Sequence, residues 1–236
     1  MTRRNTIPSI LVAIVPMLAV SACQPASAAG DAVRLPTPNV DMPETGAHTE
    51  QTAVLAGGCF WGVESVFEHV KGVRKVVAGY AGGSARTAHY DQVSDGDTGH
   101  AESVEVQFDP AQISYGQLLQ IFFSVALDPT QLDRQGPDSG PQYRSVVFYG
   151  NDEQKKVAAA YIAQLTAARS FAAPIVTRVV PLQAFYPAEA YHQDYARRHP
   201  DNPYIVYNDA PKVAHLKQLF PGLYQPEQQA VEVRPH

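Results

Sequence analysis

The pattern of apolar and polar positions predicts a mixed set of strands and helices between residues 52 and 221. Continuous or alternating apolar runs, typical of β-strands, occur at 52–56, 73–80, 101–108, 145–149 and 175–180. Apolar residues recur at helical spacing in 60–70, 114–123, 151–169 and 210–221. Pro187 is expected to lead into a further short helix. Because these elements follow one another without a long break, we expect a single domain.

Two long segments without periodicity interrupt this pattern. Residues 82–99 and 128–143 are rich in Gly, Asp, Ser, Thr and Pro, which are residues that form tight turns. Connections of this length in a compact domain are often functional, and the second could close on the first. Tyr90 lies in the first loop, where an ordinary half-buried aromatic residue and a site residue are both consistent with its spacing.

The N-terminus has the features of an export signal. Arg3 and Arg4 precede an apolar run from Ile7 to Val20 that is too short and too interrupted by proline to span a bilayer well. We therefore interpret residues 1–22 as a signal peptide and expect the protein in the periplasm or cell envelope.

The end of this signal has two interpretations. Val20-Ser21-Ala22-Cys23 resembles a bacterial lipobox, which favours lipidation of Cys23 and a lipid anchor. Alternatively, an ordinary signal peptidase cleaves after Ala26-Ser27-Ala28, and Cys23 has no role. Residues 23–50 lack periodicity and are interpreted as a flexible tether, and residues 223–236 as a C-terminal tail.

Charge and cysteine content narrow the function classes. The net charge of −5 argues against nucleic acid and anionic membrane surfaces as general partners. The chain contains two cysteines, Cys23 and Cys59, and either processing route removes Cys23 as a thiol. The domain then has no disulfide framework, CxxC pair or Cys-rich metal site. Any redox chemistry at Cys59 therefore needs a second partner.

Cys59 lies where a predicted strand meets a predicted helix. Gly57 and Gly58 precede it, and Phe60 and Trp61 follow it. At a helix N-terminus the unpaired N–H groups and the helix dipole favour an anion, so we expect Cys59 to have thiolate character. The alternative is a small cysteine that packs as a hydrophobic residue. The flanking glycines and aromatic residues favour the reactive thiol.

Glu102 is the acid that the strand pattern singles out. Alternation over 101–108 places it on the same face as Val104, Val106 and Phe108. Burial there would raise the pKa of its carboxyl group, which is typical of a general acid. The alternative is a strand that begins one residue later, with Glu102 solvated. His192 is a candidate for a Cys–His pair, although a structural histidine is favoured because no metal-type His spacing accompanies it.

Four short motifs follow one another along the chain. They are Gly-Cys-Phe-Trp-Gly-Val-Glu at 58–64, Gly-Tyr-Ala-Gly-Gly at 79–83, Gly-Asp-Thr-Gly-His-Ala-Glu at 96–102 and Gln-Tyr-Arg-Ser at 142–145. Together they resemble the A-type peptide methionine sulfoxide reductases. The resemblance implies an α/β (α+β) two-layer sandwich with a ferredoxin-like split βαβ core and long functional loops. It also implies a catalytic domain at 51–222.

The same resemblance implies catalytic roles for four residues. Cys59 would be the nucleophile that attacks the sulfoxide sulfur and is oxidised to a sulfenic acid. Glu102 would donate a proton to the departing oxygen, and the hydroxyl groups of Tyr90 and Tyr143 would polarise the S–O bond.

Substrate binding is implied for three more residues. Phe60 and Trp61 match an aromatic slot for the S-methyl group, and Asp138 matches an acidic pocket position. The implied substrate is the S epimer of methionine sulfoxide, free or in proteins, and no cofactor or metal is implied.

The chain departs from the family pattern in one respect, which concerns how oxidised Cys59 is reduced back to a thiol. Many members carry further cysteines near the C-terminus, whereas this chain has none after Cys59. We therefore expect an external reductant, either a thioredoxin-like protein or a low-molecular-weight thiol. The alternative is that Cys23, if it is not lipidated, swings back on its tether and forms a disulfide with Cys59. We also expect the enzyme to be a monomer. A cysteine hydrolase and an envelope binding module remain as hypotheses from other classes.

Overall fold

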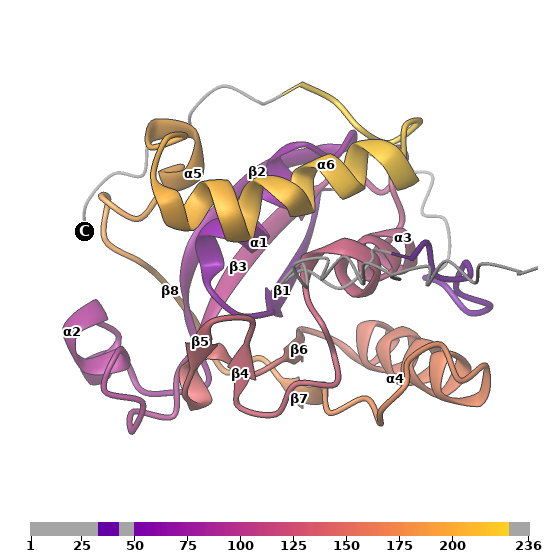
Figure 1. Cartoon of the computed structure of the whole chain (residues 1–236). Helices are drawn as coiled ribbons and strands as arrows, with labels where there is room; N and C mark the ends of the chain where they lie inside the picture. The colour runs from indigo at the N-terminus through magenta and orange to yellow at the C-terminus, as the bar shows by residue number, and fades with distance from the viewer. Residues whose placement is uncertain (1–32, 43–49, 227–236) are drawn as a thin grey trace, which may run out of the picture.

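A six-stranded mixed sheet forms the centre of this computed structural model, which describes residues 33–42 and 50–226 (Figure 1). The strands are β1 Gln51–Ala56, β2 Val73–Ala81, β3 Ala101–Phe108, β6 Val146–Tyr149, β7 Arg178–Pro181 and β8 Phe185–Pro187. Their spatial order is β7-β6-β1-β3-β2-β8, and only the β6–β7 pair is parallel among these described strands. A separate two-stranded hairpin consists of β4 Arg134–Gln135 and β5 Asp138–Ser139.

The middle of the sheet has the predicted split βαβ arrangement. Strands β6, β1, β3 and β2 are antiparallel neighbours in that order, with α1 Phe60–Glu68 between β1 and β2 and α3 Tyr115–Ile121 between β3 and β6. The remaining α-helices are α2 Tyr90–Val93, α4 Asp152–Ala167, α5 Tyr195–Arg198 and α6 Ala210–Leu219. The α+β, ferredoxin-like expectation is therefore confirmed.

The helices bury one face of the sheet. Helix α1 packs on β2 and β3, and α6 lies across α1 as an outer helix (Figure 1). The main core lies between these helices and the sheet, and it includes the fully buried Val104, Val106 and Phe108 of β3. A smaller apolar cluster, with Val54 and Phe148 at its centre, covers the opposite face.

The predicted helix starts are confirmed where a cap is present. Ser114 accepts a hydrogen bond from the Gln117 amide, and the Gln117 side chain accepts one from the Ser114 amide, so α3 begins with a complete capping box. Asn151 caps α4 by accepting a hydrogen bond from the Gln154 amide, and the Gln154 side chain accepts one from the Gly150 amide. These side chains satisfy amide groups that the first turn of a helix leaves unpaired.

Two segments in the C-terminal half of the chain differ from the sequence prediction. Phe185–Pro187 is strand β8, which pairs with the end of β2, and the chain turns after Pro187 instead of entering a helix directly. Helix α5 begins only at Tyr195. Strand β7 begins at Arg178 and not at residue 175, because its parallel pairing with β6 begins there. Short edge strands such as these are defined by their partners more than by their own pattern.

Residues 33–42, which we placed in a flexible tether, instead pack on the domain. Leu35 is buried, its amide donates to Ser124 Oγ, and Gln120 donates to its carbonyl. Tyr161 of α4 donates its hydroxyl to the Pro36 carbonyl. The predicted signal peptide, Cys23 and most of the C-terminal tail lie outside the described residues. Within the described ranges, no helix combines the length and apolarity needed to cross a bilayer.

Candidate active site

Cys59 lies at the junction of β1 and α1, as the sequence predicted. Gly57 and Gly58 end the strand, and Cys59 is the N-cap of the helix that starts at Phe60. Gly58 has a φ of +94°, and a Cβ there would lie 2.6 Å from Gln135 Cβ. Glycine is therefore required for both conformation and space. The close approach of Gln135 brings the β4–β5 hairpin against the cysteine.

The thiol of Cys59 differs from the expected thiolate. Its side chain is 8% exposed, and burial raises its pKa well above the ordinary value of 9.0. The negative charges of Glu102 and Asp209 raise this pKa further, whereas the Trp61 backbone amide and the Lys212 ammonium lower it. The helix N-terminus thus favours the anion as predicted, but desolvation outweighs it. In this structure Cys59 is a buried thiol that needs help to ionise.

The position of Glu102 confirms the prediction that strand alternation places it on the buried face. Its side chain is 3% exposed on β3, opposite Tyr80 of β2, so it does not lie at a frayed strand end. Its Oε2 accepts a hydrogen bond of 3.0 Å from the amide of Phe60, the first residue of α1. Burial raises the pKa of Glu102 from 4.5 to about 8, despite that hydrogen bond. Glu102 is therefore a protonated acid at neutral pH beside the residue that follows Cys59.

The structure brings Tyr90 and Tyr143 to the same place from the two long loops. Tyr90 begins α2 within the first loop, and Tyr143 ends a 3₁₀ turn, Pro141–Tyr143, in the second. Burial raises the pKa of both phenols, and the charges of Glu102, Asp138 and Cys59 raise them further. Both hydroxyl groups remain protonated and can donate hydrogen bonds. The loops therefore converge on the acid and the thiol.

Trp61 is held in an aromatic cluster. Its ring stacks on Tyr195 at a centroid distance of 3.8 Å and meets the edge of Tyr204 at 5.8 Å. Its indole N–H donates to His192 Nδ1 at 3.2 Å. His192 thus orients Trp61, and burial lowers its pKa. Because Nδ1 accepts that bond, the neutral ring carries its proton on Nε2 and has no free lone pair to take a proton from Cys59, as a cysteine hydrolase would require.

Phe60 and Glu64 reinforce that cluster from α1. Phe60 is buried against Tyr80 and His192, with centroid distances of 5.9 and 5.0 Å. Glu64 is also buried, and desolvation raises its pKa to about 8, whereas the backbone of Asp194 and Tyr195 lowers it. Glu64 therefore ties α1 to the turn that presents the stacking partner of Trp61, a role that the motif alone did not indicate.

Asp138 has a partner that the sequence did not reveal. It lies on β5, and its Oδ2 accepts a hydrogen bond from the hydroxyl group of Tyr204. Burial raises the pKa of Asp138, and the bond from Tyr204 lowers it. Because 66 residues separate the two in sequence, no local pattern could have paired them.

Glu189 is a second residue that sequence reasoning missed. One of its oxygens accepts from the Tyr90 amide at 3.0 Å, and the other accepts from the Tyr80 hydroxyl at 2.8 Å. It therefore fixes the start of α2, and with it Tyr90, to the sheet.

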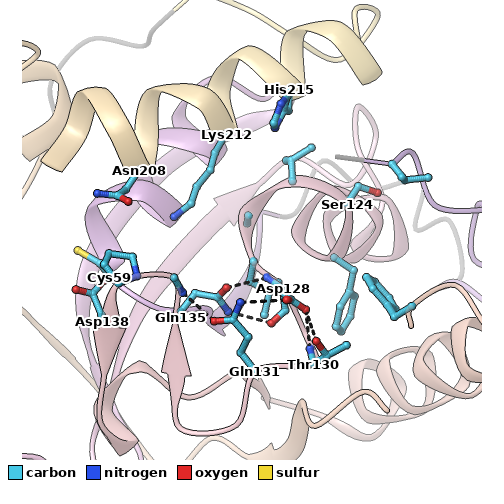
Figure 2. A pocket seen from close by; sticks show the side chains of 18 of the residues that line it. Cys59, Ser124, Asp128, Thr130, Gln131, Gln135, Asp138, Asn208, Lys212 and His215 are labelled. Carbon is cyan, nitrogen blue, oxygen red and sulfur yellow. Dashed lines mark hydrogen bonds between the residues drawn. The ribbon is translucent and has the colours of Figure 1, made fainter. Parts of the chain in front are cut away.

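A cavity of about 470 Å³ adjoins the thiol. Figure 2 shows Cys59 and Asp138 at one end of it, with Lys212 reaching toward it from α6. Gln135 lies below, fixed by hydrogen bonds of 2.9 and 3.0 Å to the Asp128 backbone. Cys59 is thus accessible from this cavity even though its own exposed surface is small.

Comparison with known protein families and sequences gives a consistent result. The family model described as peptide methionine sulfoxide reductase matches residues 51–222. Peptide methionine sulfoxide reductase MsrA 2 of Mesorhizobium japonicum is 60% identical over 183 residues, which cover 78% of this chain and 94% of that protein. Peptide methionine sulfoxide reductase MsrA of Thermus thermophilus is 49% identical over 177 residues, covering 75% and 99%.

Solved structures agree with these sequence matches. Reduced Mxr1 from Saccharomyces cerevisiae is similar with a TM-score of 0.58 and 32% identity, over 65% of this chain and 87% of that one. Methionine sulfoxide reductase A of Corynebacterium diphtheriae is similar with a TM-score of 0.56 and 33% identity, over 66% and 77%.

Proposed function

Because the chain belongs to the peptide methionine sulfoxide reductase family, an oxidoreductase family that reduces methionine sulfoxide, we propose that it acts on the S epimer through a sulfenic acid on Cys59. The substrate is methionine sulfoxide, either free or within oxidised proteins. One observation carries the proposal, namely a buried thiol, Cys59, beside a buried acid, Glu102, that keeps its proton at neutral pH.

The first half-reaction uses both groups. The methyl group of the substrate lies against Phe60 and Trp61, and the hydroxyl groups of Tyr90 and Tyr143 donate to the sulfoxide oxygen. Cys59 attacks the sulfoxide sulfur as a thiolate, while Glu102 protonates the oxygen whose bond to sulfur breaks. The oxygen takes the protons of Cys59 and Glu102 and leaves as water, while a bond forms between Cys59 and the substrate sulfur, which becomes cationic. Water then attacks the Cys59 sulfur and breaks that bond, so the substrate leaves as a thioether, Cys59 becomes a sulfenic acid, and the released proton returns to Glu102. No proton is gained or lost overall.

The second half-reaction needs two external thiol groups. Cys59 is a free cysteine, and no other cysteine lies in the described ranges. One reducing thiol forms a disulfide with Cys59 and releases the oxygen as water, and a second displaces Cys59 from that disulfide. A thioredoxin-like protein supplies both thiols from one molecule, and a low-molecular-weight thiol supplies them from two. Cys23 remains the alternative partner for the sulfenic acid.

The proposed setting is the cell envelope. The basic and apolar segments within residues 1–22 support export, and Val20-Ser21-Ala22-Cys23 supports a lipid anchor at Cys23. The protein would then repair methionine residues oxidised outside the cytoplasm. We propose that it acts there as a monomer.

The test is a turnover assay with separated sulfoxide epimers and dithiothreitol. The wild-type chain and the matched control Cys23→Ser are expected to reduce the S epimer, and Cys59→Ser to have no activity. Binding of methionine sulfoxide to Cys59→Ser should persist, because the aromatic cluster and the hydroxyl groups are unchanged. Near-normal turnover by Cys59→Ser, or a preference for the R epimer, would contradict the proposal.

A further inference from the structure

Asp209 and Lys212 form a buried ion pair that the proposed mechanism does not yet use. Asp209 ends a π-helical turn, Ile205–Asp209, and Lys212 lies in the first turn of α6. Lys212 Nζ donates to Asp209 Oδ1 at 3.1 Å. The Asp209 side chain is fully buried and that of Lys212 is 17% exposed. Lys212 is therefore a cation that points inward from α6.

This pair lies directly on the helix that carries the nucleophile. A Cβ at Gly62 would be 2.1 Å from Asp209 Oδ1 and 2.7 Å from Lys212 Nζ. Gly62 is the third residue of α1, and Cys59 is the N-cap of the same helix. The glycine of the Gly-Cys-Phe-Trp-Gly motif thus makes room for the ion pair one turn from the thiol.

Lys212 also faces the cavity beside Cys59. Lys212 lines the same cavity as Cys59, and Figure 2 shows its side chain descending from α6 toward that end. Asp209 Oδ2 is buried and has no hydrogen-bond partner among the described residues. A buried ion pair with an unsatisfied oxygen contributes little to folding stability, since desolvation offsets the attraction. A role in the chemistry at the neighbouring sulfur accounts for its presence better.

We propose that the Lys212 ammonium stabilises the anionic sulfur of Cys59, and that Asp209 is a positioning residue that holds the ammonium there. The inference rests on the proposed role of Cys59 as nucleophile. The sulfur is anionic twice in the cycle. It is a thiolate when it attacks the sulfoxide, and it leaves as a thiolate when the second reducing thiol breaks its disulfide.

The charges around Cys59 explain why a cation is needed there. The Cys59 thiol is surrounded by acidic groups. Three are the carboxyl groups of Glu102 on β3, Asp138 on β5 and Asp209, and three are the phenols of Tyr90, Tyr143 and Tyr204. Ionisation of any of these disfavours a thiolate. The Lys212 ammonium acts in the opposite direction on both Cys59 and Asp138.

The test compares Asp209→Asn with Asp209→Asn/Lys212→Met in the full-length chain. Both variants lack the negative charge of Asp209, so they differ only in the positive charge at Lys212. The pH dependence of alkylation by iodoacetamide is followed on the Cys59 peptide by mass spectrometry, so that Cys23 does not contribute. Lys217→Met is the matched control, because Lys217 lies on α6 but is exposed at its far end. Circular dichroism checks that each variant is folded.

We expect the single variant to lower the midpoint of alkylation by about one pH unit, because an ammonium without its counter-charge remains near the sulfur. Below the midpoint its alkylation rate should rise about threefold, since a less basic thiolate is also a weaker nucleophile. The double variant should lose this shift, and Lys217→Met should match the wild-type chain.

Equal midpoints in the single and double variants, both folded, would overturn the proposal, since a purely structural pair changes stability and not ionisation. An upward shift in the single variant would also overturn it. If Asp209→Asn does not fold, the same comparison is made with Asp209→Ser, which fits beside Gly62 because it is smaller. If Asp209→Asn shows no shift but Cys59→Ser is inactive in the turnover assay, the role of Lys212 is overturned and the proposed function stands. The two failures are therefore distinguishable.

Discussion

Replacement of Glu102 by glutamine should make the protein more stable and less active at the same time. The amide of glutamine can still accept from the Phe60 amide, and like a protonated carboxyl group it can donate toward the substrate oxygen. It cannot, however, transfer a proton. We expect turnover of the S epimer to fall by about 100-fold or more, which is the usual contribution of general acid catalysis.

The stability gain follows from the pKa of Glu102, which is raised from 4.5 to about 8 in the folded state. A carboxyl group whose pKa is raised by folding contributes stability fully below its unfolded pKa, and this contribution is lost as the pH rises through about 8. At pH 7 the folded chain must therefore hold a proton about two and a half pH units above the unfolded pKa, at about 1.4 kcal/mol for each unit. Glutamine avoids this cost, so Glu102→Gln should gain up to about 3 kcal/mol at pH 7.

Urea unfolding at pH 7 and at pH 4.5 measures the effect. The gain should be large at pH 7 and nearly absent at pH 4.5, where the unfolded chain also holds much of the proton. Glu105→Gln is the matched control, because Glu105 lies on the same strand with its side chain on the opposite, more exposed face. A loss of stability in Glu102→Gln at pH 7, or a gain that is equal at both pH values, would show that Glu102 is not held as a buried, protonated acid.

Two further substitutions test the parts of the site that sequence did not reveal. Tyr204→Phe removes the hydroxyl group that donates to Asp138, and kcat/KM for the S epimer should fall about tenfold, as for the loss of a hydrogen bond to a charged group. The control Tyr149→Phe, which lies far away on β6, should have no effect. An unchanged kcat/KM in Tyr204→Phe would show that Tyr204 is not part of the site. Gly62→Ala forces a Cβ against Asp209 Oδ1 and should lower the free energy of unfolding by about 1–3 kcal/mol, the usual cost of overpacking. The same change in an Asp209→Ala chain should cost much less, and equal costs in the two backgrounds would contradict the packing argument.

The sequence predicted those site features that depend on local pattern. Alternation along 101–108 placed Glu102 on the buried face, and the glycines before Cys59 placed the thiol at a strand–helix junction. Both positions are confirmed, because period-two alternation and tight turns are properties of short segments. The convergence of the two long loops was also foreseen, and it brings Tyr90 and Tyr143 to Glu102.

The sequence could not predict the features that depend on tertiary packing. The bond between Tyr204 and Asp138 and the approach of Asp209 to Gly62 join segments far apart in the chain. The ionisation of Cys59 was mispredicted for a related reason. The helix N-terminus is visible in the sequence, but the desolvation that opposes it arises only when β3, the hairpin and α6 close around the sulfur.

A single turnover without any reductant isolates the oxidation of Cys59 from its later reduction. One equivalent of the S epimer is mixed with the wild-type chain, and methionine and the oxidation state of Cys59 are measured together by mass spectrometry. The proposed mechanism predicts about one methionine per protein and one added oxygen on Cys59, carried as a sulfenic acid that a reducing thiol removes. A disulfide between Cys23 and Cys59 would replace the external thiol in the second half-reaction, whereas methionine formed with Cys59 unmodified would exclude Cys59 as the group that is oxidised.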